Sequence, residues 1–283
     1  MEQELYKTRS AAACVKAAYH RLYDQRRAVF RKMWLPSLCY AVAIASAYVP
    51  YVQFVSLLLI VAAALWYYAR VFTLLNDLSE RKNCLKLLKS YLVYAAIAFL
   101  TIILFGAIVF GLLWLLPQPA TEGHCGMYFI GYFAVATVVG GIVALLLVAL
   151  PLSYFLMKYM VEDVSLRKNL WPGCKTGLRH WGLLFLTALI IGLVLTVVYL
   201  VVFMPQFILF GAQMTSTAGV LMGDEAGLPS SFGWLMALSV AFSAFVLLLL
   251  YIWPIFSMYY AYGSIEQQET ERRKTAISAT PEE

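Results

Sequence analysis

The residues best suited to chemistry lie in two short polar segments between long apolar runs. One segment, 122–126, reads Glu-Gly-His-Cys-Gly, and the other carries Asp224 and Glu225. Carboxylates and an imidazole bind divalent cations, but a metal site needs three or four ligands that converge. Two interpretations stay open: a cation site or outer-surface enzyme centre around Glu122, His124 and Asp224, or two ordinary polar turns. The polar turns are the simpler interpretation, so we expect no metal and no cofactor.

Sequence motifs of nucleotide-binding and hydrolytic enzymes are absent. The chain contains no GxxxxGK[ST], GxSxG, HExxH or GxGxxG pattern. The adjacent side chains of His124 and Cys125 diverge, so they do not form a nucleophile with its base. We therefore predict that the protein is not an enzyme and has no catalytic residues.

The composition indicates that most of the chain lies in a membrane. Of 283 residues, 63% are hydrophobic and only 13% are charged, about half the charged share of a soluble domain. Apolar runs of about 20 residues cross a bilayer as helices. Such runs occupy 90–116, 127–157, 182–211 and 232–262, and 33–69 suffices for two helices that turn at Pro50. A re-entrant hairpin is the alternative for 33–69.

These runs predict an all-α, polytopic membrane bundle of about six transmembrane helices, arranged as three hairpins. We expect a basic amphipathic cytoplasmic helix at 1–32, a transmembrane domain at 33–262 and a flexible cytoplasmic tail at 263–283. The three hairpins are 33–69, 90–157 and 182–262.

The positions of the cationic residues predict the orientation in the membrane. Every Lys and Arg lies in the N-terminal region, in 70–89, in 158–179 or in the tail, and the alternate gaps contain none. Cytoplasmic loops accumulate Lys and Arg. Both termini of this multi-pass protein are therefore expected in the cytoplasm. This topology explains the basic surplus, so we predict no nucleic-acid partner.

A polar heptapeptide occurs twice, as DLSERKN at 77–83 and DVSLRKN at 163–169, with five of seven residues identical. We interpret 77–160 and 163–262 as copies of one unit, a parallel internal repeat. The first hairpin, preceded by Asp24-Gln-Arg-Arg27, is a candidate third copy. Each heptapeptide is predicted to begin an amphipathic elbow helix, whose capping residues come from Asp77, Ser79, Asp163 and Ser165.

Cations on the elbow segments can meet anionic phospholipid headgroups at the cytoplasmic face. The candidate contacts with lipid or with a protein partner are Arg27, Arg31, Arg81, Lys82, Arg167, Lys168, Lys175 and Arg179. An apolar stripe in the N-terminal segment is formed by Val15, Tyr19, Leu22, Tyr23, Phe30 and Met33. The alternative is a solvated collar that only orients the protein, and a second copy of the chain is an alternative partner.

The predicted spans contain no Asp, Glu, Lys, Arg or His, which argues against ion-coupled transport and charge-lined pores. Their neutral polar residues are expected to bridge helices; these are Gln53, Thr101, Thr137, Thr187, Thr196, Gln206 and Ser243. The small residues Ala41 and Ala45, and Ala43 and Ala47, have the spacing of a close helix contact.

The order of elements, in which an Asp-x-Ser elbow leads through 175–181 into a long apolar helix, resembles one group of bacterial inner-membrane proteins. These six-helix proteins are related to the membrane domain of some glycerophosphodiester phosphodiesterases. The resemblance implies a bacterial cytoplasmic (inner) membrane protein. It brings no catalytic residues, because the soluble phosphodiesterase domain of some relatives is not part of this sequence.

We therefore predict a non-enzymatic integral membrane protein that binds a protein partner or a lipid, as a scaffold or accessory subunit. The alternative is an uncoupled transporter or lipid-translocating protein. That alternative requires a cavity between the repeats, near Pro151, Pro205 and Pro254.

Overall fold

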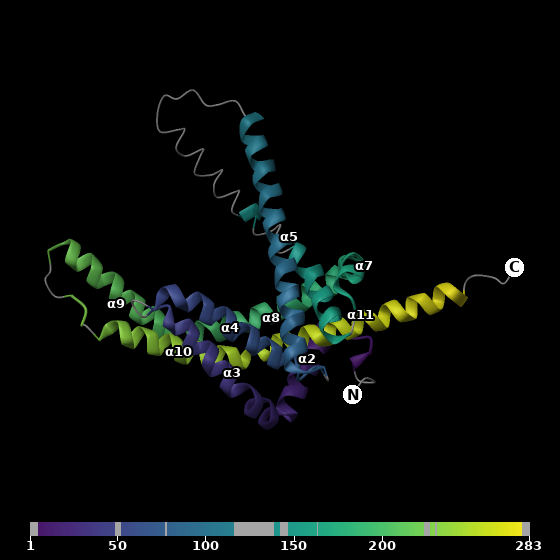
Figure 1. Ribbon diagram of the computed structural model, residues 1–283, viewed down its shortest axis with the longest axis horizontal. Helices are drawn as coiled ribbons and strands as arrows, with labels where there is room; N and C mark the ends of the chain where they lie inside the picture. Colours follow the sequence, from purple (N-terminus) through teal and green to yellow (C-terminus); the bar gives the residue numbers. More distant parts are fainter. Residues whose placement is uncertain are drawn as a thin grey trace. The chain divides into compact units, whose positions relative to one another are not determined.

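The computed structural model describes residues 5–48, 52–76, 78–115, 139–141, 147–162, 164–223, 227–229 and 231–278, and its elements there are helices (Figure 1). Five of these helices are long and apolar enough to cross a membrane. They support the prediction of a helical membrane protein. Most of the predicted span 127–157 lies outside the described residues. The described part of this span includes the apolar helix Leu147–Val161, which is shorter than the five candidate spans.

The chain forms two compact units, which are described separately. The first unit comprises Met1–Leu87 and Gly182–Glu283, and the second comprises Leu88–Trp181. The helices of the first unit are α2 (Ala11–Asp24), α3 (Arg26–Ser46), α4 (Gln53–Phe72), the start of α5 (Glu80–Leu115), α8 (Trp181–Val202), α9 (Met204–Leu221), α10 (Phe232–Leu250) and α11 (Ile252–Ser278). The second unit holds the rest of α5, the helix Leu147–Val161 and α7 (Leu166–Arg179).

Helix α3 packs against both α4 and α10 in the first unit (Figure 1). Its alanines Ala41, Ala43 and Ala45 are buried, because small side chains let helix backbones approach closely. The hydroxyl of Tyr67 on α4 donates a hydrogen bond of 2.6 Å to the carbonyl of Leu248 on α10. Three of the four alanines that the sequence predicts for close packing are thus buried on α3, and Ala47 is half-buried.

The predicted single helix at 1–32 is divided in two. Helix α2 ends at Asp24 and α3 begins at Arg26, with Gln25 between them at φ −100° and ψ 12°. The break lets the two helices pack against different partners: α2 packs on α11, while α3 packs on α4 and α10. The buried face of α2 is formed by Ala11, Cys14, Val15 and Ala18, so it shares only Val15 with the predicted apolar stripe.

Small residues make the contact between α2 and α11 close. Ala11, Cys14 and Ala18 are at most 2% exposed. The Arg9 amide donates to the Ser264 hydroxyl at 2.9 Å, and that hydroxyl donates to the Arg9 carbonyl at 3.0 Å. A Cβ on Gly263 would lie 2.6 Å from the Leu5 carbonyl oxygen. Residues that the sequence assigned to a flexible tail at 263–283 therefore continue α11 to Ser278, anchored by the N-terminal segment.

Helix breaks interrupt the third predicted hairpin, 182–262. The first break separates α8 from α9 at Phe203, where Pro205 occupies the first turn of α9. Proline has no amide hydrogen to donate within a helix, so it favours such a break. The second break separates α10 from α11 at Tyr251. Both breaks border the cavity described below.

In the second unit, two glycines of α7 allow it to approach the helix Leu147–Val161. A Cβ on Gly177 would lie 2.9 Å from the Cα of Pro151, and one on Gly173 would lie 3.1 Å from the Phe155 ring. The Tyr94 hydroxyl of α5 donates to the Leu152 carbonyl at 2.6 Å. The helix that follows the second heptapeptide is therefore packed closely within its own unit.

Candidate functional site: an aromatic cavity

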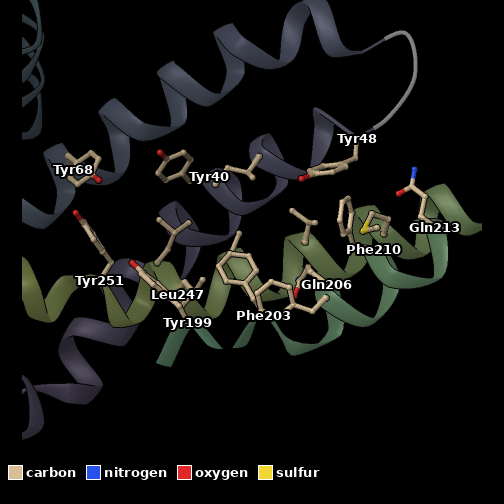
Figure 2. A pocket seen from close by; sticks show the side chains of 16 residues that line it. Tyr40, Tyr48, Tyr68, Tyr199, Phe203, Gln206, Phe210, Gln213, Leu247 and Tyr251 are labelled. Carbon is tan, nitrogen blue, oxygen red and sulfur yellow. The ribbon is translucent and has the colours of Figure 1, made fainter. Parts of the chain in front are cut away.

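The first unit contains a cavity of about 810 Å³ between α3, α4, α8, α9 and α10 (Figure 2). We call it the aromatic cavity. This volume is within the range of sites that hold a small molecule. Among its described lining residues there is no Asp, Glu, Lys, Arg or His. The polar groups on its wall are all neutral and come from Tyr40, Tyr48, Tyr68, Tyr199, Tyr251, Gln206 and Gln213.

Four tyrosines gather at one end of the aromatic cavity. Figure 2 shows Tyr40, Tyr68, Tyr199 and Tyr251 there, contributed by α3, α4, α8 and the break after α10. Tyr67 contacts two of them, with its ring centroid 5.8 Å from that of Tyr40 and 5.2 Å from that of Tyr68. A tyrosine hydroxyl both donates and accepts hydrogen bonds. This end of the cavity can therefore meet either kind of polar group on a ligand.

Gln206 is held by hydrogen bonds from α9 to α10. Its amide nitrogen donates to the Ser239 carbonyl at 2.8 Å and to the Ser243 hydroxyl at 2.6 Å. Ser243 in turn donates to the Val202 carbonyl, at the end of α8, at 3.0 Å. These bonds fix the orientation of the carboxamide on the cavity wall.

The other atom of this carboxamide, Gln206 Oε1, is buried and has no hydrogen-bond partner. An amide oxygen has two acceptor positions, and an unsatisfied buried acceptor costs about 1–3 kcal/mol. Gln206 lines the aromatic cavity. A ligand that donates a hydrogen bond here would satisfy the acceptor.

The remaining wall suits hydrocarbon. Phe203, Phe207, Met236 and Leu247 are among its apolar members. Transfer of an unpaired charge into such surroundings is unfavourable. The arrangement can therefore hold an amphiphilic molecule with an uncharged polar group.

The predicted bridging role of neutral polar residues is confirmed for Gln206 and Ser243, which join α9 to α10. Three threonines of the same predicted set instead form hydrogen bonds within their own helices. Thr101, Thr187 and Thr196 donate to the carbonyls four residues earlier, at 2.7–2.8 Å. Such bonds satisfy the hydroxyl without a second helix.

The eight cations predicted to contact lipid or a partner are all exposed. Those of the first unit are Arg27, Arg31, Arg81 and Lys82, and those of the second unit are Arg167, Lys168, Lys175 and Arg179. Arg70 on α4, which is not one of these eight residues, forms an ion pair with Glu80 at the start of α5.

The proposed caps are described only in part. Asp77 and Asp163 lie outside the described residues. Helix α5 begins at Glu80, directly after Ser79. Ser165 occupies the N-cap position of α7, but its side chain makes no capping hydrogen bond.

The asparagines that end the two heptapeptides have different surroundings, which sequence reasoning missed. Asn83 is fully buried and exchanges two 3.0 Å hydrogen bonds with Asn76. Asn169 has a buried amide nitrogen without a hydrogen-bond partner. Glu162 stands at the position that matches Asn76, and it approaches Lys158 at 3.9 Å. A seven-residue Asn–Asn spacing is the sequence signal that predicts the first pair.

The residues first considered for cation binding, Glu122, His124, Cys125, Asp224 and Glu225, lie outside the described residues. Within the described ranges no group of three or more His, Cys, Asp or Glu side chains can hold a metal ion. Cys14 is fully buried against α11, and this burial raises the pKa of its thiol to about 11, although Arg9 acts in the opposite direction. A thiol with so high a pKa is protonated at neutral pH and therefore unreactive.

Comparison with known proteins gives no relative: no protein-family model, curated protein or solved structure matches the chain. The resemblance to six-helix inner-membrane proteins thus remains a prediction from the sequence. A function for this chain is argued from its site, because a fold alone does not specify one.

Proposed function

We propose that this integral membrane protein binds one uncharged amphiphile in the aromatic cavity, with a hydrogen-bond donor of the ligand on Gln206. One observation carries the proposal: Gln206, whose buried amide oxygen has no hydrogen-bond partner, is among the residues that line an 810 Å³ cavity. The lining described for this cavity is free of acidic and basic side chains. A neutral lipid-like molecule satisfies both conditions.

The polar group of the ligand follows from what Gln206 needs. A hydroxyl or an amide N–H donates to Oε1, as in long-chain alcohols, acylglycerols and isoprenoid alcohols. A carboxylate has no donor and would face the amide oxygen with no cation to compensate it. An ammonium group can donate, but its charge would have no acidic partner in the cavity.

We also propose that the chain crosses the inner membrane six times, with both termini in the cytoplasm. The distribution of Lys and Arg supports this layout, with 127–157 as the sixth span and 33–69 as a full hairpin. The two heptapeptides support a parallel repeat with cytoplasmic elbow helices. In this layout Tyr40, Tyr199 and Tyr251 fall near the middle of their spans, so the ligand lies in the hydrocarbon layer.

Release of the ligand to the other leaflet is the second candidate function, that of an uncoupled translocating protein. The observation in its favour is the position of the helix breaks at Phe203 and Tyr251, because both residues line the aromatic cavity. Broken helices of transporters occur where they line a cavity. The cavity lies between the first and third predicted hairpins, however, and not between the two copies of the repeat.

The proposal is tested by thermal stabilisation with ligands that share one hydrocarbon chain. Purified protein in lipid nanodiscs receives hexadecanol, palmitic acid, hexadecylamine or hexadecane. The alcohol should raise the unfolding temperature of the wild type and lose most of this effect in Gln206→Leu. The matched control is Gln213→Leu, which changes the other glutamine on the cavity wall and should keep the response.

Each shift is measured against the same variant without ligand, so a loss of intrinsic stability does not enter the result. Equal stabilisation of the wild type and Gln206→Leu by the alcohol would overturn the proposal. Stabilisation by palmitate as large as that by hexadecanol, at an alkaline pH where the carboxyl group is ionised, would overturn it as well. Flux of a fluorescent alcohol across liposomes containing the protein distinguishes translocation from static binding.

A further inference from the structure

A second cavity, of about 420 Å³, lies in the first unit beside the turn between α2 and α3. We call it the elbow slot. Its wall includes Val194 and Val198 of α8 and Leu250 and Trp253 at the end of α10 and the start of α11. Arg26 is the one charged side chain among the described residues that line it.

The guanidinium of Arg26 is held at the rim of the elbow slot by Tyr23. Its Cζ atom lies 4.6 Å from the centre of the Tyr23 ring, and its Nη1 donates to the Tyr23 carbonyl at 3.2 Å. A guanidinium has five N–H donors in a planar fork that matches phosphate geometry. Arg26 is exposed, so the cation is positioned by its neighbour while its outer edge can meet an anion.

The chain that carries the α2–α3 turn is basic in sequence. Over residues 5–48 Asp24 is the only acidic residue, whereas the basic residues are Lys7, Arg9, Lys16, Arg21, Arg26, Arg27, Arg31 and Lys32. An anion near the α2–α3 turn is therefore favoured electrostatically. Below it the slot offers only apolar and aromatic walls.

We infer that the elbow slot is a binding site for one anionic glycerophospholipid, with an acyl chain in the slot and the phosphate on Arg26. Both parts of the site are needed for this assignment. A free phosphate would leave the apolar slot empty, and a neutral amphiphile would make no use of the positioned cation. The site is distinct from the aromatic cavity, because Leu248 and Tyr251 line that cavity while Leu249, Leu250 and Trp253 line the slot.

The test is native mass spectrometry of the full chain released from nanodiscs that contain equal amounts of phosphatidylglycerol and phosphatidylcholine with the same acyl chains. The wild type should retain one phosphatidylglycerol in preference to phosphatidylcholine. Arg26→Gln should reduce this preference about fivefold, the contribution of one basic residue near an anionic lipid. Lys32→Gln is the matched control, since Lys32 is exposed on the same helix but does not line the slot.

A second variant examines the acyl-chain part of the site. Val198→Trp fills the slot without a change in charge, so it should reduce retention of phosphatidylglycerol while Arg26 is intact. Equal losses in Arg26→Gln and Lys32→Gln would overturn the inference, because diffuse surface charge would then explain the preference. Inorganic phosphate that displaces the lipid in the millimolar range would overturn it too, since the apolar slot would then add nothing.

The experiment also separates this inference from the proposed function. Gln206→Leu should leave phosphatidylglycerol retention unchanged, and Arg26→Gln should leave stabilisation by hexadecanol unchanged. Failure at one cavity therefore does not imply failure at the other.

Discussion

The aromatic cavity and the elbow slot share the end of α10 as a wall, but their polar groups differ in charge and in origin. The aromatic cavity has neutral hydroxyls and amides, including an amide oxygen that Ser239 and Ser243 position through the opposite atom of the carboxamide. The elbow slot has one guanidinium, positioned by a tyrosine ring. In apolar surroundings an unpaired charge is costly, so the two walls select ligands of different charge. Under the two proposals, the same helix would serve ligands of different charge at its two cavities.

The largest effect is expected from blocking the aromatic cavity. Ala244 lines it, and Ala244→Trp places an indole in the ligand volume. Stabilisation by hexadecanol should disappear, while retention of phosphatidylglycerol should stay at the wild-type level. Thermal unfolding with and without ligand measures the first quantity, and native mass spectrometry measures the second.

The control is Leu238→Trp, a residue of the same helix that is 69% exposed and does not line the cavity. It should behave as the wild type in both measurements. If Ala244→Trp keeps the full response to hexadecanol, the ligand does not occupy the aromatic cavity.

The next largest effect is a change of ligand class. Gln206→Glu places a carboxylate where the aromatic cavity has a neutral amide, which removes the main difference between the two sites. Hexadecylamine should then stabilise the variant about tenfold more strongly, in apparent affinity, than it stabilises the wild type, because a charge-assisted hydrogen bond contributes about 1.5–3 kcal/mol. Titration of the unfolding temperature with amine gives the affinities. An unchanged response to the amine would indicate that ligands do not contact position 206.

Ionic strength should separate the two sites by a smaller factor. Raising salt from about 0.1 M to 1 M shortens the Debye length from about 10 Å to about 3 Å. The phosphatidylglycerol preference at the elbow slot should fall severalfold, whereas stabilisation by hexadecanol should be insensitive. Parallel measurements in both buffers test this, and an equal response of both ligands to salt would contradict the charge difference between the sites.

The smallest expected effect concerns the framework behind the tyrosine end of the aromatic cavity. Tyr67→Phe removes the hydrogen bond to the Leu248 carbonyl and should lower the free energy of unfolding by about 1 kcal/mol. This corresponds to a decrease of about 2–4 °C in the unfolding temperature. Both ligand responses should persist. Tyr48→Phe, at a tyrosine that is 51% exposed, is the control and should show no decrease.

The helices could be predicted from the sequence because hydropathy and proline positions are local signals. A few adjacent residues suffice to predict the apolar parts of α3 and α4 and the burial of Ala41 and Ala45. They also suffice to predict the helix break near Pro205. The continuation of α11 to Ser278 could not be predicted in this way. It depends on packing against α2 and against the segment before α2, where Gly263 meets Leu5 from the other end of the chain.

The candidate site was less accessible to sequence reasoning. Gln206 and Ser243 were correctly expected to bridge helices, but the second atom of the carboxamide and its position on a cavity wall depend on three-dimensional packing. The four tyrosines of the cavity end come from four separate segments, and tyrosine is common in this chain. For the elbow slot, the sequence predicted the neighbouring residue: Arg27 was a candidate lipid contact, whereas Arg26 is the cation that contacts Tyr23.

The central claim, occupation of the aromatic cavity by a neutral lipid, is tested most directly by photo-crosslinking in cells. Benzoylphenylalanine replaces Phe203, which lines the cavity, or Phe242, which is 67% exposed and is not among the residues lining the cavity. After irradiation, mass spectrometry of the protein should find a neutral lipid attached at position 203 and bulk phospholipids attached at position 242. The same phospholipid adducts at both positions, or no adduct at 203 when 242 reacts, would contradict the claim.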